Sequence, residues 1–181
     1  MVSWPRVARR IRVPVGFVFA VVYLWLAEPT LVSLSAGFAL IVVGLLIRAL
    51  ASGHVQKNEQ LTTSGPYAYT RNPLYLGSSI LAMGFALAAR SWWIAAGMVV
   101  IFAAIYWPVI KSEEEFLRVK FSAYEDYARN VPRLFPRLTP FAKSAGEFSW
   151  TLYCKHREYN AFLGSLAVLA VLAIKMMMKR H

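Results

Sequence analysis

Residues 65–77 read GPYAYTRNPLYLG, and they interrupt a chain whose flanking segments are mostly apolar. These thirteen residues include two prolines, two glycines, three tyrosines and an arginine. Gly-Pro and Asn-Pro are turn signals, so we predict a rigid loop that leads into an apolar helix at Leu74. The apolar sequence around the loop decides the fold class.

The chain has 181 residues, of which 58% are hydrophobic. This composition is typical of a compact membrane bundle and not of a soluble domain. A membrane-spanning helix needs about 20 mostly apolar residues, and fewer when charged ends reach back to the interface. We therefore predict an all-α integral membrane domain over residues 1–181, with about five spans at 13–28, 31–50, 74–89, 92–110 and 160–178.

The net charge of +11 does not by itself indicate nucleic-acid binding, because the basic residues are distributed unevenly. If the N-terminus lies inside, 16 of the 20 lysines and arginines fall on the inner side, beginning with Arg6, Arg9, Arg10 and Arg12. The positive-inside rule then sets the orientation of the chain. The remaining cations are Arg90, Lys175, Lys179 and Arg180. Either the tail cations reach the outer interface by snorkelling, or the last apolar segment does not cross.

The beginning of the chain resembles a signal peptide, but no small-residue cleavage site follows, so we predict a retained first span. The only cysteine, Cys154, excludes an internal disulfide and a multi-cysteine metal site. His54, His156 and His181 are isolated and lack the spacing of metal ligands. We therefore predict no metal site.

The predicted connections differ in length between the two membrane faces. The outer ones, at 28–30 and 90–91, are minimal, whereas the inner polar segments run over 51–73 and 111–158. Long loops carry function more often than short ones. We expect the chemistry at the inner, cytoplasmic membrane surface.

The second inner segment has the pattern of an amphipathic helix. Leu117, Phe121 and Tyr124 recur at helical spacing after Ser112. We expect this helix to end before Pro132, because a residue that precedes proline disfavours the helical conformation.

The predicted hairpin of spans 74–89 and 92–110 returns both inner segments to one surface. Arg71 and Asn72 should then face Glu113 and Glu114. A guanidinium binds a carboxylate by paired hydrogen bonds, tyrosine rings stack on heterocycles and attract cations, and carboxylates accept hydrogen bonds from hydroxyl and ammonium groups. S-adenosylmethionine, with an amino acid end, a sulfonium, a ribose and an adenine, is a ligand that uses all of these groups.

The same residues carry a family resemblance. GPYAYTRNPLYLG, followed at 113–136 by EEEFLRVKFSAYEDYARNVPRLFP, resembles the signature of the isoprenylcysteine carboxyl methyltransferase and phospholipid N-methyltransferase superfamily of membrane enzymes. The resemblance covers a catalytic core at about 61–136. Asn72 stands where that signature usually has a histidine, and asparagine does not titrate near neutral pH.

The resemblance implies transfer of a methyl group from S-adenosylmethionine to a lipophilic acceptor that enters from the bilayer, as in isoprenylcysteine carboxyl methylation. It implies catalytic roles for Arg71, Asn72, Glu113 and Glu114. The implied cofactor pocket on the inner face is lined by Tyr67, Arg71, Asn72, Pro73, Tyr75, Leu76, Glu113 and Glu114, and closed by Tyr124, Tyr127 and Arg133. It implies neither a nucleic-acid partner nor a particular oligomeric state.

Other interpretations stay open from the sequence. A first alternative is a methyltransferase whose acceptor is a phospholipid or a small thiol or amine. A second is a membrane reductase of the sterol-reductase type that uses NADPH. A third is a non-catalytic membrane assembly subunit. Locally, the loop also fits an interfacial belt, and Ser112 with Glu115 also fits a capping box at a helix start.

Overall fold

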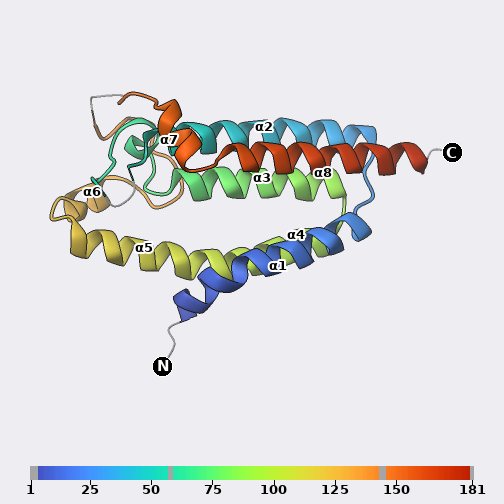
Figure 1. Cartoon of the computed structure of the whole chain (residues 1–181), viewed down its shortest axis with the longest axis horizontal. Helices are drawn as coiled ribbons and strands as arrows, with labels where there is room; N and C mark the ends of the chain where they lie inside the picture. Colours follow the sequence, from blue (N-terminus) through green and yellow to red (C-terminus); the bar gives the residue numbers. More distant parts are fainter. Residues whose placement is uncertain (1–3, 57–58, 143–145, 180–181) are drawn as a thin grey trace. The chain divides into compact units, whose positions relative to one another are not determined.

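The computed structural model describes residues 4–56, 59–142 and 146–179, and within these ranges the chain is helical without a β-strand. The predicted all-α class is confirmed. The tail residues Arg180 and His181, and the side chains of Arg6, Arg9 and Arg12, lie outside the described residues. Figure 1 shows the elements in chain order: α1 Trp4–Leu26, α2 Leu31–His54, the 3₁₀ turn η1 Gly65–Ala68, α3 Pro73–Ala89, α4 Trp92–Ile101, the π-helical turn η2 Phe102–Tyr106, α5 Trp107–Lys120, α6 Tyr124–Asn130, α7 Trp150–Lys155 and α8 Tyr159–Met178.

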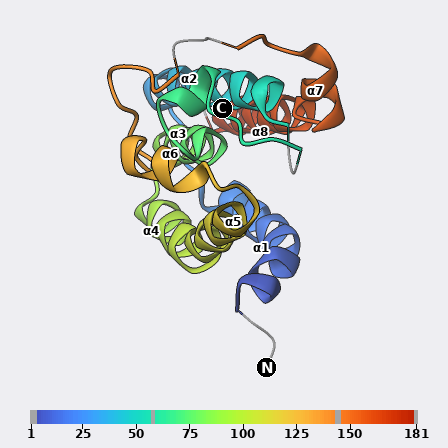
Figure 2. The same ribbon diagram turned by 90° about the vertical axis from the view of Figure 1, so that its left-hand side faces the viewer.

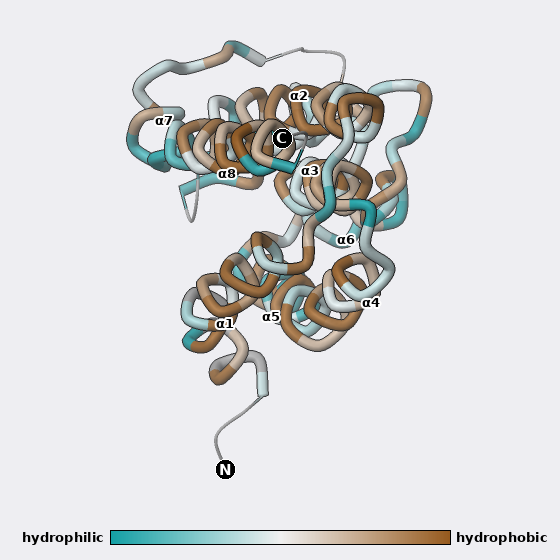
Figure 3. The backbone as a smooth tube through the Cα atoms, turned by 90° about the vertical axis from the view of Figure 1, so that its right-hand side faces the viewer, coloured by the Kyte–Doolittle hydropathy of each residue, from teal (hydrophilic) through white to brown (hydrophobic). Residues whose placement is uncertain are grey.

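Three helical stretches are long and apolar enough to cross a membrane, namely Leu31–His54, Trp92–Lys120 and Tyr159–Met178. Two shorter apolar helices, Pro14–Leu26 and Pro73–Ala89, coincide with the other predicted spans. The hydropathy colouring in Figure 3 shows that hydrophobic residues predominate along α2, α4 and α8. Each predicted span is therefore an apolar helix, and the number that crosses the bilayer stays a prediction.

The chain divides into two compact units. One comprises Met1–Ile41, Ala82–Glu115 and Leu166–His181, and the other Val42–Leu81 and Phe116–Ser165. Helices α2, α3, α5 and α8 contribute residues to both. The buried core of the first unit consists of Tyr23, Ala27, Ala88, Ala89, Ile94 and Leu172. The second unit contains an aromatic core formed by Tyr124, Tyr127 and Val131.

Helices α2 and α3 pack antiparallel through glycines. In the first unit, a Cβ atom added to Gly37 would lie 2.5 Å from the carbonyl oxygen of Gly84. In the second unit, a Cβ atom added to Gly44 would lie 2.7 Å from the carbonyl oxygen of Gly77. Small residues let membrane helices approach until their backbones touch. The glycine that ends the quoted loop is therefore also a helix-packing residue.

The π-helical turn η2 accommodates Pro108 inside the long helix Trp92–Lys120. A proline has no amide hydrogen, so it cannot bond to the carbonyl group four residues earlier, which belongs to Ala104. The indole N–H of Trp4 donates to this Ala104 carbonyl at 3.0 Å. Pro108 is thus accommodated by a π turn, and the carbonyl that it leaves without an α-helical partner is bonded by α1.

The C-terminal end of α3 is bonded by residues of the N-terminal segment. Carbonyl groups at a helix end have no partner within the helix, and an apolar environment supplies none. Two such oxygens accept hydrogen bonds, namely Ala88 O from Ser33 Oγ at 3.2 Å and Ala89 O from the Glu28 amide at 2.8 Å. Tyr23 Oη donates to Phe85 O, just before the last turn, at 2.9 Å.

The tail cations lie at the end of α1. The Lys175 ammonium donates to the carbonyl oxygens of Leu24 and Trp25 at 2.7 and 2.9 Å, and Lys179 pairs with Glu28 at 2.8 Å. A cation is favourable at a helix C-terminus. The end of α8 therefore lies beside the connection 27–30, which the predicted topology places outside. Whether the last apolar segment crosses the bilayer stays a prediction.

The prediction of one amphipathic helix in the second inner segment is wrong, because the structure has two helices there. The helix of the fourth span continues to Lys120, the chain turns at 121–123, and α6 begins at Tyr124. An Arg118–Glu125 ion pair bridges this turn. The expected end before Pro132 is confirmed, because α6 ends at Asn130 and the next residue is extended.

We predict that Gly84→Val destabilises the protein by about 1–3 kcal/mol, as expected for overpacking. The new side chain would begin 2.7 Å from the carbonyl oxygen of Gly37. The measurement is thermal unfolding of the purified protein in detergent.

The matched control is Gly164→Val on α8, where an added Cβ atom meets nothing within 4 Å. Both variants place valine in an apolar helix, so the difference in unfolding midpoint isolates the packing term. Equal midpoints for the two variants would contradict the proposed glycine packing.

Candidate functional site

The loop ahead of α3 is joined to the segment 131–141 within the second unit. Figure 2 shows α6, which leads into that segment, beside the start of α3. The joining is made largely by the backbone, so it does not depend on flexible side chains. Three hydrogen bonds form it, namely Arg71 N–H to Pro132 O, Arg137 N–H to Tyr69 O and Phe141 N–H to Ala68 O, each at 2.9 Å.

Two buried side chains of the loop converge on one carbonyl group. Thr70 Oγ1 and Asn72 Nδ2 both donate to the carbonyl oxygen of Arg133 at 3.1 Å. Thr70 was not among the predicted site residues, because a threonine in a loop carries no pattern that distinguishes it. Asn72 and Arg133, which the resemblance places in one pocket, are thus in direct contact.

The start of α3 is set by the sequence Asn72-Pro73. Proline suits the first helical position, because its fixed φ is preorganised for the helix and an amide hydrogen there has no partner within the helix. The first helical bond runs from the Leu76 amide to the Asn72 carbonyl at 3.0 Å. Tyr75 and Leu76, predicted to line the pocket, lie half-buried in this first turn.

Arg71 lies half-buried between the loop and α6. Its guanidinium is 3.5 Å from the hydroxyl oxygen of Tyr124, a long and therefore weak hydrogen bond. The Tyr127 hydroxyl donates to the Tyr67 carbonyl at 2.7 Å. Tyr67, Arg71, Tyr124 and Tyr127 thus lie close together, and their predicted role in a cofactor pocket stays a prediction.

The rings of Tyr124 and Tyr127 meet edge to face at a centroid distance of 6.2 Å. They are almost fully buried against Val131, Phe141 and neighbouring apolar side chains. In this structure the two rings belong to the buried core, and the Tyr127 hydroxyl bonds this core to the loop. Their predicted contact with the cofactor stays a prediction.

The glutamates Glu113 and Glu114 lie within α5, six and seven residues after its start at Trp107. The alternative interpretation of Ser112 and Glu115 as a capping box is therefore wrong, since this position is a helix interior. Glu114 is only 4% exposed. A buried carboxylate needs a charged or hydrogen-bonding partner. A buried ionisable residue in a membrane helix is typical of a functional position. Both residues belong to the first unit, so their approach to Arg71 stays a prediction.

An ion pair between Arg48 and Glu158 was missed by sequence reasoning. Arg48 Nε lies 2.5 Å from Glu158 Oε1, and the same guanidinium bonds to the hydroxyl of Ser78. The two charged side chains are 24% and 10% exposed. Arg48 lies on α2, Ser78 on α3 and Glu158 in the connection before α8, so these contacts join the three segments. No local pattern links residues so far apart in the chain.

The donor set of the second unit fits the chemistry of S-adenosylmethionine. The Arg71 guanidinium suits a carboxylate, and the half-buried Tyr75 and Leu76 suit a flat adenine. The buried hydrogen bonds of Asn72 fix the backbone between these groups. The residues present are therefore compatible with the cofactor that the resemblance implies.

The described residues include no group of three or more His, Cys, Asp or Glu side chains close enough to hold a metal ion. Within this part of the chain, the ring Nδ1 atoms of His54 and His156 lie 2.7 and 3.1 Å from the carbonyl oxygens of Leu50 and Ser52. Cys154 is exposed.

An all-helical chain with several apolar helices and a braced, tyrosine-rich and arginine-containing loop defines a membrane protein with a candidate polar site. The profile of the phospholipid methyltransferase family matches residues 32–124. The chain belongs to this family, which is part of the isoprenylcysteine and phospholipid methyltransferase superfamily of integral membrane proteins. The matched range contains the whole loop, Glu113 and Glu114.

Two curated relatives carry names that refer to metal resistance. The cobalt-zinc-cadmium resistance protein CzcN of Cupriavidus metallidurans is 36% identical over 135 residues, 74% of this chain and 60% of that protein. The nickel-cobalt-cadmium resistance protein NccN of Alcaligenes xylosoxydans xylosoxydans is 36% identical over 118 residues, 65% of this chain and 54% of that protein. The chain thus spans less than two thirds of either relative's length. No solved structure matches the chain.

We predict that Tyr127→Phe lowers the stability of the protein by about 1–3 kcal/mol. The variant removes the hydroxyl that bonds to Tyr67 and leaves a buried carbonyl without this donor. The measurement is again the thermal unfolding midpoint in detergent.

The control for this variant is Tyr69→Phe. Tyr69 lies in the same loop, but it is exposed, and its hydroxyl forms no hydrogen bond with the described part of the chain. We expect a midpoint close to that of the wild type. If Tyr127→Phe behaves like Tyr69→Phe, the loop is not held through α6.

Proposed function

We propose that the protein is an S-adenosylmethionine-dependent methyltransferase that modifies a lipophilic acceptor at the membrane surface. The observation that carries the proposal is the braced loop. Arg71 and Asn72 are held against 131–133 by backbone and side-chain hydrogen bonds, and the loop that carries them lies within the range that the methyltransferase family profile matches. These hydrogen bonds fix the backbone around Arg71, a half-buried cation next to the start of α3.

The cofactor pocket is proposed to open on the inner, cytoplasmic side of a bundle of about five spans. In this arrangement Arg71 would bind the carboxylate of S-adenosylmethionine, and Glu113 and Glu114 would accept hydrogen bonds from its ammonium or ribose hydroxyl groups. Tyr67, Pro73, Tyr75 and Leu76 would form the apolar wall, with Tyr124, Tyr127 and Arg133 behind the loop.

When bound, S-adenosylmethionine supplies an electrophilic methyl group. The chain's own task is to align the acceptor and to exclude water, which together provide most of the acceleration in such a transfer. A carboxylate or thiolate acceptor requires no base at neutral pH. An amine acceptor must lose a proton, and Asn72 cannot take it, so a glutamate would have to do so.

The acceptor is proposed to be a bilayer-dissolved molecule that enters between the apolar helices. An isoprenylcysteine-type carboxylate agrees with the resemblance of the loop, whereas a phospholipid agrees with the name of the matching family. A dissolved acceptor and a water-soluble methyl donor meet only at the membrane interface. The braced loop combines tyrosines, prolines and an arginine next to an apolar helix, which is a composition typical of such an interface.

We predict that the purified protein binds S-adenosylhomocysteine and that Arg71→Ala or Glu114→Gln weakens this binding by about 10-fold or more. Loss of a hydrogen bond to a charged group has an effect of this size. The measurement is isothermal titration calorimetry in detergent.

Each of these variants has a control at an exposed residue of the same type. Arg129→Ala removes an exposed arginine of α6, and Glu115→Gln removes the exposed neighbour of Glu114. Both should retain the wild-type affinity. Binding of NADPH without binding of S-adenosylhomocysteine would reject the methyltransferase in favour of a reductase, and binding of neither would favour a non-catalytic protein.

We also predict that S-adenosylmethionine labelled on its methyl group transfers the label to one component of a total lipid extract. Extraction and mass spectrometry would identify the acceptor as a carboxylate, amine or thiol. The Arg71→Ala protein, incubated in parallel, should transfer at least about 10-fold less label at limiting cofactor. Label confined to water-soluble products would contradict the lipophilic acceptor.

A further inference from the structure

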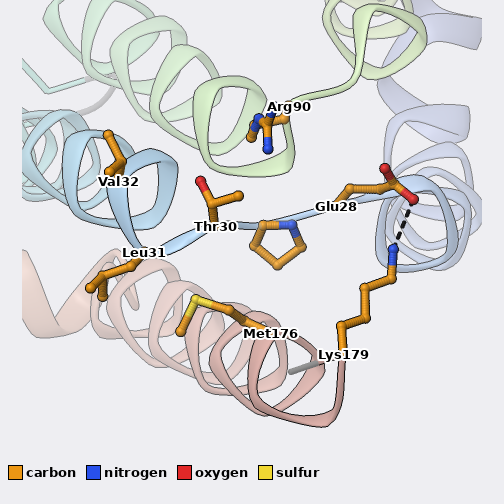
Figure 4. A pocket seen from close by; sticks show the side chains of 8 residues that line it. Glu28, Thr30, Leu31, Val32, Arg90, Met176 and Lys179 are labelled. Atoms are coloured by element: carbon orange, nitrogen blue, oxygen red, sulfur yellow. Dashed lines mark hydrogen bonds and ion pairs between the residues drawn. The ribbon is translucent and has the colours of Figure 1, made fainter. Parts of the chain in front are cut away.

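A second candidate binding site lies within the first unit, where α1 and α3 end and α2 begins. A cavity of about 500 Å³ opens there. Figure 4 shows its side chains, which come from the connection 28–30, the start of α2, the turn after α3 and the end of α8. Its lining residues are Glu28, Pro29, Thr30, Leu31, Val32, Arg90, Met176 and Lys179.

The cavity carries an excess of positive charge. Lys179 donates to Glu28 at 2.8 Å, and Lys175 bonds to the end of α1 nearby. The hydrogen bond and charge of Lys179, with the charges of Lys175 and Arg90, lower the pKa of Glu28 below its usual value, so this carboxylate is ionised at neutral pH. Among the residues that line the cavity, Arg90 and Lys179 are cations and Glu28 is an acid, so the lining carries one net positive charge. The excess suits an anion.

Arg90 is the cation best placed to bind such an anion. Among the described residues its guanidinium makes neither a hydrogen bond nor a close ion pair, and its side chain is one of those that line the cavity (Figure 4). Its backbone has a positive φ of 54°, a conformation in which glycine would be less strained.

The rest of the wall is apolar. Leu31 and Val32 are strongly exposed at the start of α2, and Met176 faces them from α8. A purely inorganic anion would gain nothing from such a wall. An anion joined to a hydrocarbon chain would use both parts of the cavity.

We propose that this cavity binds the phosphate group of a phospholipid. The planar guanidinium of Arg90 donates paired hydrogen bonds to two phosphate oxygens, and Lys179 adds a second positive charge. The acyl chains lie against Leu31, Val32 and Met176. The proposal stands independently of methyl transfer, because it uses none of the residues assigned to the cofactor pocket.

The test is calorimetric titration of the full chain in detergent with three probes. These are a short-chain phosphatidylglycerol, a diacylglycerol of the same chain length, and inorganic phosphate. We expect saturable binding of phosphatidylglycerol and no saturable binding of diacylglycerol. Phosphate bound as tightly as the lipid would still support the anion site but assign it to a soluble phosphate compound. Equal binding of both lipids would overturn the proposal.

Two variants should change the affinity for phosphatidylglycerol in opposite directions. Arg90→Gly removes the guanidinium and relieves the positive φ, so we expect about 10-fold weaker binding without loss of stability. Glu28→Gln removes the negative charge and releases Lys179, so we expect tighter binding, an effect that misfolding cannot imitate.

Arg129→Ala, an exposed arginine of α6, is the control for general charge effects. We expect it to bind like the wild type. An affinity unchanged by Arg90→Gly, or lowered equally by Arg129→Ala, would overturn the assignment of the phosphate to this cavity.

Discussion

The contact of α2 with α3 through paired glycines is the constraint on which the remaining structure depends. Gly37 touches Gly84 in the first unit, and Gly44 touches Gly77 in the second, with the pairs one heptad apart on each helix. Apolar side chains gain little by packing against each other instead of against lipid tails, so close backbone approach is the stronger source of helix association. Because Gly77 lies in the second turn of α3, this contact also fixes the helix start and the loop before it.

A second constraint is that backbone carbonyl groups in an apolar environment need donors. It explains why polar residues occur in otherwise apolar helices of the first unit. Ser33 bonds to the end of α3, Lys175 bonds to the end of α1, and Trp4 bonds to the carbonyl that Pro108 leaves open. Each of these side chains serves a carbonyl that its own helix cannot satisfy.

The sequence was sufficient to locate the apolar helices and the loop, because hydrophobic periodicity and turn residues are local signals. The resemblance named Arg71, Asn72, Tyr124 and Arg133 as pocket residues; in the structure Arg71 contacts Tyr124 and Asn72 contacts Arg133, while their role toward a cofactor stays a prediction. The sequence did not reveal the extension of the fourth helix to Lys120, because the polar run that starts at Ser112 also fits the start of a new helix. Long-range pairs such as Arg48 with Glu158 were equally invisible, because neither residue's neighbours indicate a partner.

Asn72 is the position where this chain departs from the usual signature, and the structure gives the departure a physical meaning. The side-chain amide of Asn72 donates to the backbone carbonyl of Arg133, and the backbone carbonyl of Asn72 accepts the first helical hydrogen bond of α3. A neutral histidine could donate the same side-chain bond from one ring nitrogen, so the bracing is available to either residue. Histidine could additionally exchange a proton through its second nitrogen, which asparagine cannot do. On the proposed function, an asparagine here therefore favours an acceptor that is already ionised, such as a carboxylate or a thiolate, over one that must first be deprotonated.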